Sequence, residues 1–154
     1  MITRYVKTVG REVHLPPGTT DDQVFHETFV KQFHDPPYEI RPATVLDPGC
    51  NIGLTAAHFE LLWPNAEIIG VDPDSENCVA ARRNCQRTRI LNVAVSATSG
   101  RQTYSGEEAW SLRLDASGDR AVVARMLDEL TDLFGGSADF VKMDIEGPAS
   151  CRCS

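Results

Sequence analysis

The sequence lacks the features that would place the chain in a membrane or outside the cell. Among its 154 residues, no apolar run approaches the roughly 18 residues needed to span a bilayer. Residues 1–7 have neither the apolar segment nor the small-residue cleavage site of a secretory signal peptide. The five cysteines are odd in number, and no pair has C-x-x-C spacing. We therefore expect a cytoplasmic protein with no membrane insertion, no disulfide framework and no zinc site.

Positive charge is also scarce. The 15 Lys and Arg residues are outnumbered by 22 Asp and Glu residues, which gives a formal net charge of −7. The one basic cluster, residues 82–89, is explained by the solvated face and end of a helix. Nucleic-acid binding needs clustered cations that face phosphates, so we expect no nucleic-acid partner. The four histidines are scattered without metal-ligand spacing, and we expect no metal site.

What the sequence does contain is the pattern of an α/β domain. Apolar residues make up 42% and charged residues 24% of the chain, which is the balance of a globular protein with one core. From residue 43 onward, short apolar runs alternate with helical stretches. The predicted strands are 44–47, 67–72, 90–95, 121–126 and 138–145, and the predicted helices are 52–62, a helix that begins near Ser75, and 127–134. This alternation predicts a doubly wound, Rossmann-like parallel sheet.

Segments outside these elements are predicted to flank or connect the core. A hairpin over residues 3–15 is followed by a helix that begins at the capping-box sequence near Thr20 and ends before Asp35. Residues 96–119 read as a long connection, with short strands near 102–104 and 110–112. The expected division is a flanking unit at 1–42, a core domain at 43–147 and an irregular tail at 148–154.

The most informative segment is Asp47-Pro48-Gly49-Cys50-Asn51-Ile52-Gly53, where the first predicted strand turns into a helix. In a doubly wound sheet, ligands bind at the carboxyl ends of strands, and a glycine there lets a ligand approach the backbone. A dinucleotide site would need G-x-G-x-x-G, which is absent. Asp47 suits an amino group, and the helix N-terminus suits a carboxylate. The loop therefore predicts a site for an amino-acid moiety, although a plain strand–helix turn would also contain such glycines.

Asp72 ends the next predicted strand, one βαβ unit after Asp47. A carboxylate at that position can accept hydrogen bonds from a ribose diol. An amino-acid end, a ribose and an adjoining adenine together describe S-adenosylmethionine. The predicted cofactor-binding residues are Asp47, Gly49, Cys50, Asn51, Gly53 and Asp72.

Asp144-Ile145-Glu146-Gly147 closes the last predicted strand. In a doubly wound sheet this strand lies next to the first, and its carboxyl end faces the same ligand site. Asp144 and Glu146 are therefore the candidate catalytic residues, acting as a base. The alternative is that both are only polar residues at a strand end.

With these segments in order, the chain resembles the FkbM family of class I S-adenosylmethionine-dependent methyltransferases. The matching segments are Val45–Gly53, Val71–Asp74 with Asn84, Leu127–Leu130 and Phe140–Gly147. The resemblance implies methylation of a hydroxyl on a small-molecule, sugar or lipid-like acceptor. It also implies cofactor contacts from Asp47, Gly49, Asn51 and Asp72, with Asp144 and Glu146 beside the reacting centre.

The chain departs from the family at two places. Pro48 stands where the family usually has an aliphatic residue, and Cys50 where it has a small one. The family domain also continues beyond the last strand, whereas only seven residues follow Gly147 here. We therefore expect a domain that lacks its last strands, with a last strand open to self-association. The alternatives to an enzyme are an inactive cofactor-binding remnant or a partner-binding module, and a nicotinamide dehydrogenase is disfavoured by the missing third glycine.

Overall fold

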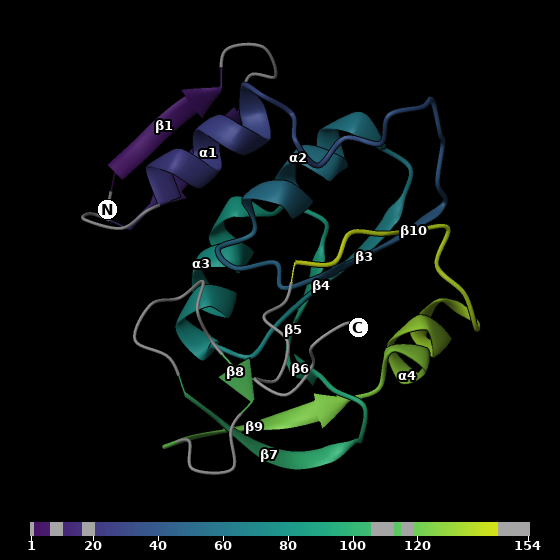
Figure 1. Ribbon diagram of the computed structural model, residues 1–154. Coiled ribbons are helices and arrows are strands. Elements are labelled where there is room, and N and C mark those ends of the chain that lie inside the picture. The colour runs from purple at the N-terminus through teal and green to yellow at the C-terminus, as the bar shows by residue number, and fades with distance from the viewer. Residues whose placement is uncertain (1, 7–10, 17–20, 106–112, 115–118, 145–154) are drawn as a thin grey trace, which may run out of the picture.

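A four-stranded parallel sheet forms the centre of the fold (Figure 1). The computed structural model describes residues 2–6, 11–16, 21–105, 113–114 and 119–144. The central sheet has the order β10-β3-β4-β5, and its strands are β10 (Phe140–Val141), β3 (Thr44–Pro48), β4 (Glu67–Asp72) and β5 (Arg89–Asn92). All three pairings are parallel. The order runs outward from β3 to β5 on one side and returns to β10 on the other, so the switch point of a doubly wound sheet lies between β3 and β10.

Helices cover both faces of this sheet. Successive residues of a strand point to opposite faces, and here the apolar side chains on each face pack against a different set of helices. On one face, Val45 and Ile68 pack with Phe59 of α2 (Leu54–Leu62) and with Trp63, the residue directly after that helix. Leu46 and Ile69 pack on the other face with Leu130 of α4 (Leu127–Thr131), which continues into the 3₁₀ helix η1 (Asp132–Phe134). Helix α3 (Ser75–Asn84) lies on the same face as α2, through Cys78 and Ala81. The predicted α/β Rossmann-like fold is confirmed.

A second sheet with the order β6-β9-β7-β8 was not predicted as such. It contains β6 (Ala94–Val95), β9 (Arg120–Arg125), β7 (Gly100–Ser105) and β8 (Arg113–Leu114). The strand predicted over 90–95 is divided at Val93, and β6 leaves the central sheet to pair with β9. The other pairings are antiparallel. Val122 and Ala124 are buried while Val123 is exposed, which is the one-sided burial typical of antiparallel sheets. The 110–112 prediction lies outside the described residues.

The N-terminal hairpin is confirmed, and the end of α1 differs from prediction. Strands β1 (Ile2–Val6) and β2 (Arg11–Leu15) pair antiparallel, and α1 (Asp21–Phe29) follows. Helix α1 ends four residues earlier than its apolar pattern suggests, and Phe33 is exposed rather than packed. Helix α3 begins at Ser75, as predicted, and the side chain of Asp74 caps it by accepting hydrogen bonds from the backbone N–H groups of Glu76 and Asn77.

Strand β10 is shorter than the predicted 138–145, but its hydrogen bonds to β3 continue. Lys142 N donates to Leu46 O at 3.0 Å, and Asp144 N donates to Pro48 O at 3.0 Å. The last strand therefore runs beside the first as far as Pro48, where β3 ends, as predicted. No helix in the described part of the chain is long and apolar enough to cross a membrane.

Candidate functional site

The candidate site lies at the carboxyl ends of β3, β4 and β10, beside the switch point. The loop after β3 carries three left-handed residues, Gly49 with φ 75°, Asn51 with φ 48° and Gly53 with φ 79°. The N–H groups of Gly49 and Cys50 both donate to Val71 O of β4, at 2.9 and 3.0 Å. These bonds fix the loop, called here the glycine loop (residues 47–53), against the neighbouring strand.

Two of the predicted cofactor residues face the protein core rather than a ligand. A Cβ placed on Gly53 would lie 2.9 Å from Cα of Ala81, so this glycine allows α3 to approach closely. The side chain of Cys50 is 3% exposed and packs against Gly70 and Ile90. Burial also raises the pKa of the Cys50 thiol well above its usual range. A ligand could therefore meet Cys50 and Gly53 only through their backbone.

The carboxylate of Asp72 fixes the conformation of the site from the end of β4. One oxygen, Oδ2, accepts a hydrogen bond from Asn51 N at 2.9 Å. The other, Oδ1, accepts from Asp74 N at 2.9 Å and from Asn77 Nδ2 at 3.1 Å. Burial raises the pKa of Asp72 to about 6, although these hydrogen bonds act in the opposite direction. Asp72 thus joins the glycine loop to the start of α3.

Lys142 is a buried charged residue of the candidate site that sequence reasoning missed. Its ammonium group is 3.1 Å from Asp47 Oδ1 and 3.3 Å from the carbonyl oxygen of Gly49. Asp47 is 0% exposed, so this ion pair is buried beneath the glycine loop. Burial lowers the pKa of Lys142, but the charges of Asp47 and Asp144 outweigh burial and raise it, so the ammonium stays protonated. The sequence signal for Lys142 was its position in the apolar segment 140–143, directly before Asp144.

Three buried side-chain oxygen atoms of the glycine loop accept no hydrogen bond from the described residues, and one of them, Asp47 Oδ1, is instead ion-paired with Lys142. Asp47 Oδ2 and Asn51 Oδ1 are hidden from solvent and have no hydrogen-bond partner in the described part of the chain. Burial raises the pKa of the Asp47 carboxyl, against the effect of Lys142. Unpaired buried acceptors are costly, and they mark places where a hydrogen-bond donor is missing.

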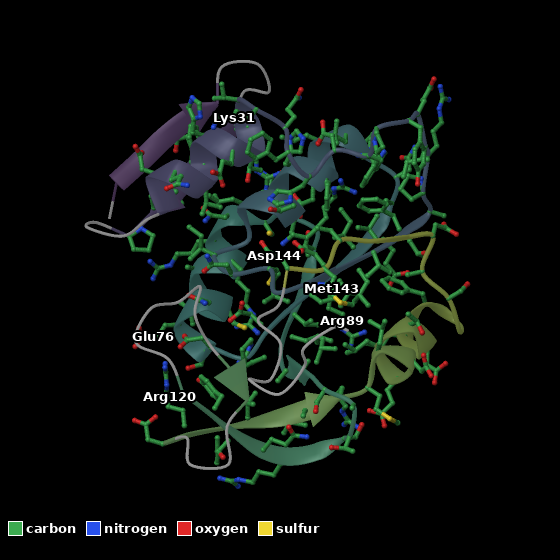
Figure 2. The ribbon with its side chains drawn as sticks, viewed as in Figure 1. Lys31, Glu76, Arg89, Arg120, Met143 and Asp144 are labelled. Carbon is green, nitrogen blue, oxygen red and sulfur yellow. The ribbon has the colours of Figure 1, made fainter. Side chains whose placement is uncertain are left out.

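Asp144, labelled in Figure 2, follows β10 at this edge of the sheet, and its side chain is 72% exposed. Its carboxylate is 3.7 Å from the Lys142 ammonium. Glu146, the second predicted catalytic residue, lies outside the described residues. His34, in the segment after α1, is half-buried near the same groups. Burial lowers the pKa of His34, and Lys142 lowers it further.

The second sheet contacts the site at the start of α3. Arg120 of β9 forms an ion pair with Asp74 at 2.9 Å, and its guanidinium lies 4.7 Å from the centroid of the Tyr104 ring. Figure 2 shows Arg120 on the same side of the molecule as Glu76, in the first turn of α3. Asp74 therefore caps α3 and anchors the second sheet beside Asp72. Within the described residues, no cluster of three or more His, Cys, Asp or Glu side chains is placed to hold a metal ion.

Comparisons with known proteins give weak but consistent relatives. No family model matches the chain. The 2-O-methyltransferase NoeI of Sinorhizobium fredii is 28% identical over 134 residues, covering 69% of this chain and 54% of that protein. An uncharacterized protein of Rickettsia prowazekii is 28% identical over 101 residues, covering 64% of this chain and 40% of that protein. The chain spans about half the length, or less, of these curated relatives.

Among solved structures, the fold is similar to the plantazolicin methyltransferase BpumL in complex with a monoazolic desmethylPZN analog and SAH. The TM-score is 0.40 at 15% identity, and the match covers 49% of this chain and 37% of that one. A second crystal structure of the same enzyme with SAH matches with a TM-score of 0.34 at 18% identity.

Proposed function

We propose that the chain belongs to an S-adenosylmethionine-dependent methyltransferase of the FkbM type, which methylates a hydroxyl oxygen of a small-molecule, sugar or lipid-like acceptor. The observation that carries the proposal is the glycine loop at the switch point, with its two unpartnered buried oxygens. The similarity to a 2-O-methyltransferase supports the same reaction class.

The residues present fit the amino-acid end of that cofactor. An ammonium group has three N–H donors and no acceptor. Asp47 Oδ2 and Asn51 Oδ1 are acceptors that lack donors among the described residues. Because Asp47 is fully buried, a ligand would reach it only after a small shift of the glycine loop. Asp72, at the end of the next strand, would hold the ribose.

Bound S-adenosylmethionine would supply an electrophilic methyl group on a sulfonium. The chain itself has to align the acceptor oxygen with that methyl and accept the proton of the acceptor hydroxyl. Asp144 is exposed at the carboxyl end of the strand that borders the glycine loop, within reach of an acceptor. We therefore assign it the role of base, with Glu146 as the neighbouring alternative.

Calorimetric titration with S-adenosylhomocysteine tests the cofactor assignment, with NADH as the competing ligand class. We expect binding of S-adenosylhomocysteine and none of NADH. In Gly49→Val, binding should be lost, because a side chain at φ 75° would be strained and would occupy the ligand's approach. Gly136→Val is the matched control: its φ is 115°, and a Cβ there meets no atom within 4 Å. Binding of NADH instead, or of neither ligand, would refute the proposal.

A further inference from the structure

Two of the three contacts of the Lys142 ammonium, those with Asp47 and Gly49, join segments that are far apart in the sequence. Asp47 and Gly49 belong to the glycine loop, whereas Lys142 and Asp144 belong to β10 and its extension. The side chain of Lys142 is only 8% exposed. A lysine so deeply buried is rare unless its charge is paired, and here the pairing holds the loop to the last strand.

The backbone of the same two segments is already aligned. Hydrogen bonds from Lys142 N to Leu46 O and from Asp144 N to Pro48 O, both 3.0 Å, keep β10 in register up to the loop. Beyond Pro48 the loop leaves this ladder, and the Lys142 ammonium takes over by donating to the Gly49 carbonyl. Asn51 is left-handed, a conformation that is unfavourable for a non-glycine residue and persists only where surrounding bonds hold the backbone in place.

We infer that Lys142 is a positioning residue of the cofactor site: its ammonium clamps the glycine loop to β10 and sets the distance between the cofactor loop and Asp144. This inference rests on the proposed function for the identity of the ligand, but the clamp itself is a property of the ligand-free chain. Lys142 is not itself the base, because it is buried beneath the loop and already paired with Asp47.

Lys142→Met tests the clamp, because methionine keeps an unbranched side chain of similar length without charge or donors. We expect its affinity for S-adenosylhomocysteine, measured by calorimetry, to fall at least about tenfold. Amide hydrogen exchange should quicken by at least about tenfold at Cys50 and Asn51 in the absence of ligand, and remain unchanged at Ile69 in the sheet centre. A general loss of stability would instead quicken exchange at all three positions.

Lys31→Met is the control, since Lys31 is exposed and lies over the Phe33 ring at 5.0 Å. It should leave both measurements unchanged. If Lys142→Met does not fold, Lys142→Gln is measured in the same way; it keeps a donor for the Gly49 carbonyl but no charge, and we expect a smaller change in the same direction.

The two readouts separate this inference from the proposed function. If wild-type protein fails to bind S-adenosylhomocysteine, the proposed function fails, and the exchange rates alone decide whether the clamp exists. Unchanged exchange at Cys50 and Asn51, exchange that rises equally at Ile69, or wild-type affinity in the Lys142 variant overturns the inference.

Discussion

Glu60 and Asp47 are both carboxylates removed from solvent, but their surroundings differ. Glu60 on α2 accepts hydrogen bonds from the Arg11 guanidinium, from the backbone N–H groups of Gln86, Arg87 and Thr88, and from the Thr88 hydroxyl. Burial alone would raise the pKa of Glu60, yet these donors lower it to about 2. Among the described residues, the carboxylate of Asp47 is paired only with the Lys142 ammonium, and burial raises the pKa of Asp47.

The difference distinguishes a structural carboxylate from a candidate ligand-binding one. Glu60 ties the N-terminal hairpin to α2 and to the turn after α3, and all its hydrogen-bonding capacity is used within the protein. Asp47 sits at the ligand edge of the sheet with one oxygen unpartnered among the described residues. A buried carboxylate whose hydrogen bonds are all made within the protein indicates a structural role. A buried carboxylate with an unused acceptor oxygen at the switch point of the sheet indicates a place for a ligand.

The largest expected loss of stability follows from removing the charge of Glu60. Glu60→Gln leaves Arg11 buried at 7% exposure without its counter-charge, so the free energy of unfolding should fall by about 3–5 kcal/mol. Urea denaturation measures it. Glu39→Gln is the matched control, because the Glu39–Arg41 pair is 84% and 88% exposed and should contribute less than about 1 kcal/mol. Equal, small changes in both variants would contradict the structural role.

Gly53→Ala should have the next largest effect. The variant combines a left-handed backbone with a Cβ 2.9 Å from the backbone of Ala81, so we expect a loss of about 2–4 kcal/mol. Gly135→Ala is the control that measures the cost of the left-handed backbone alone, because φ of Gly135 is 92° and a Cβ there meets no atom within 4 Å. A loss of about 1–2 kcal/mol is expected for that control. If both variants lose the same amount by urea denaturation, Gly53 is not a packing glycine.

Much of the fold could be predicted because its pattern is local. Strand β4 has the bounds predicted from its apolar run, and the placement of the last strand beside the first follows from the doubly wound order. Strands near 102–104 and at 121–126 were predicted and correspond to β7 and β9. Their pairing into a second sheet, and the division of the 90–95 segment at Val93, could not be predicted because both depend on tertiary contacts. The end of α1 was misjudged because Phe33 has helical spacing but is exposed.

The candidate site could be predicted only as a set of positions. Sequence spacing brought Asp47, Asn51 and Asp72 to one edge, because the carboxyl ends of parallel strands meet there. It could not tell which of them would be exposed, nor that Cys50 and Gly53 face the core. Lys142 escaped notice because a lysine in a short strand ordinarily points to solvent, and only the packed fold places its ammonium under the loop.

Asp72→Asn should have a moderate effect that depends on pH. The pKa of Asp72 is raised to about 6 in the folded protein, so between pH 4 and 6 the folded state binds more protons than the unfolded one. Wild-type stability therefore falls with rising pH in this window, by about 3 kcal/mol from this group. The variant should lack that slope, and should bind S-adenosylhomocysteine about 1–3 kcal/mol more weakly. Asp132→Asn, on the exposed η1, is the control and should keep the wild-type dependence of stability on pH. If Asp72→Asn also keeps it, Asp72 is not the group that causes the fall in stability between pH 4 and 6.

The smallest effect on stability, but a distinct effect on assembly, is expected at β10. Among the described strands β10 lies at the edge of the central sheet, and Val141 and Met143 are 37% and 49% exposed. An edge with free backbone groups and apolar side chains can pair with a second copy of the chain. We expect concentration-dependent self-association in light scattering, reduced by Val141→Lys, because a charge on an edge strand opposes pairing. Val123→Lys is the control, since Val123 is 46% exposed on β9, which is paired on both sides. A wild-type chain that stays monomeric at all concentrations, or equal effects of the two lysines, would show that this edge does not mediate association.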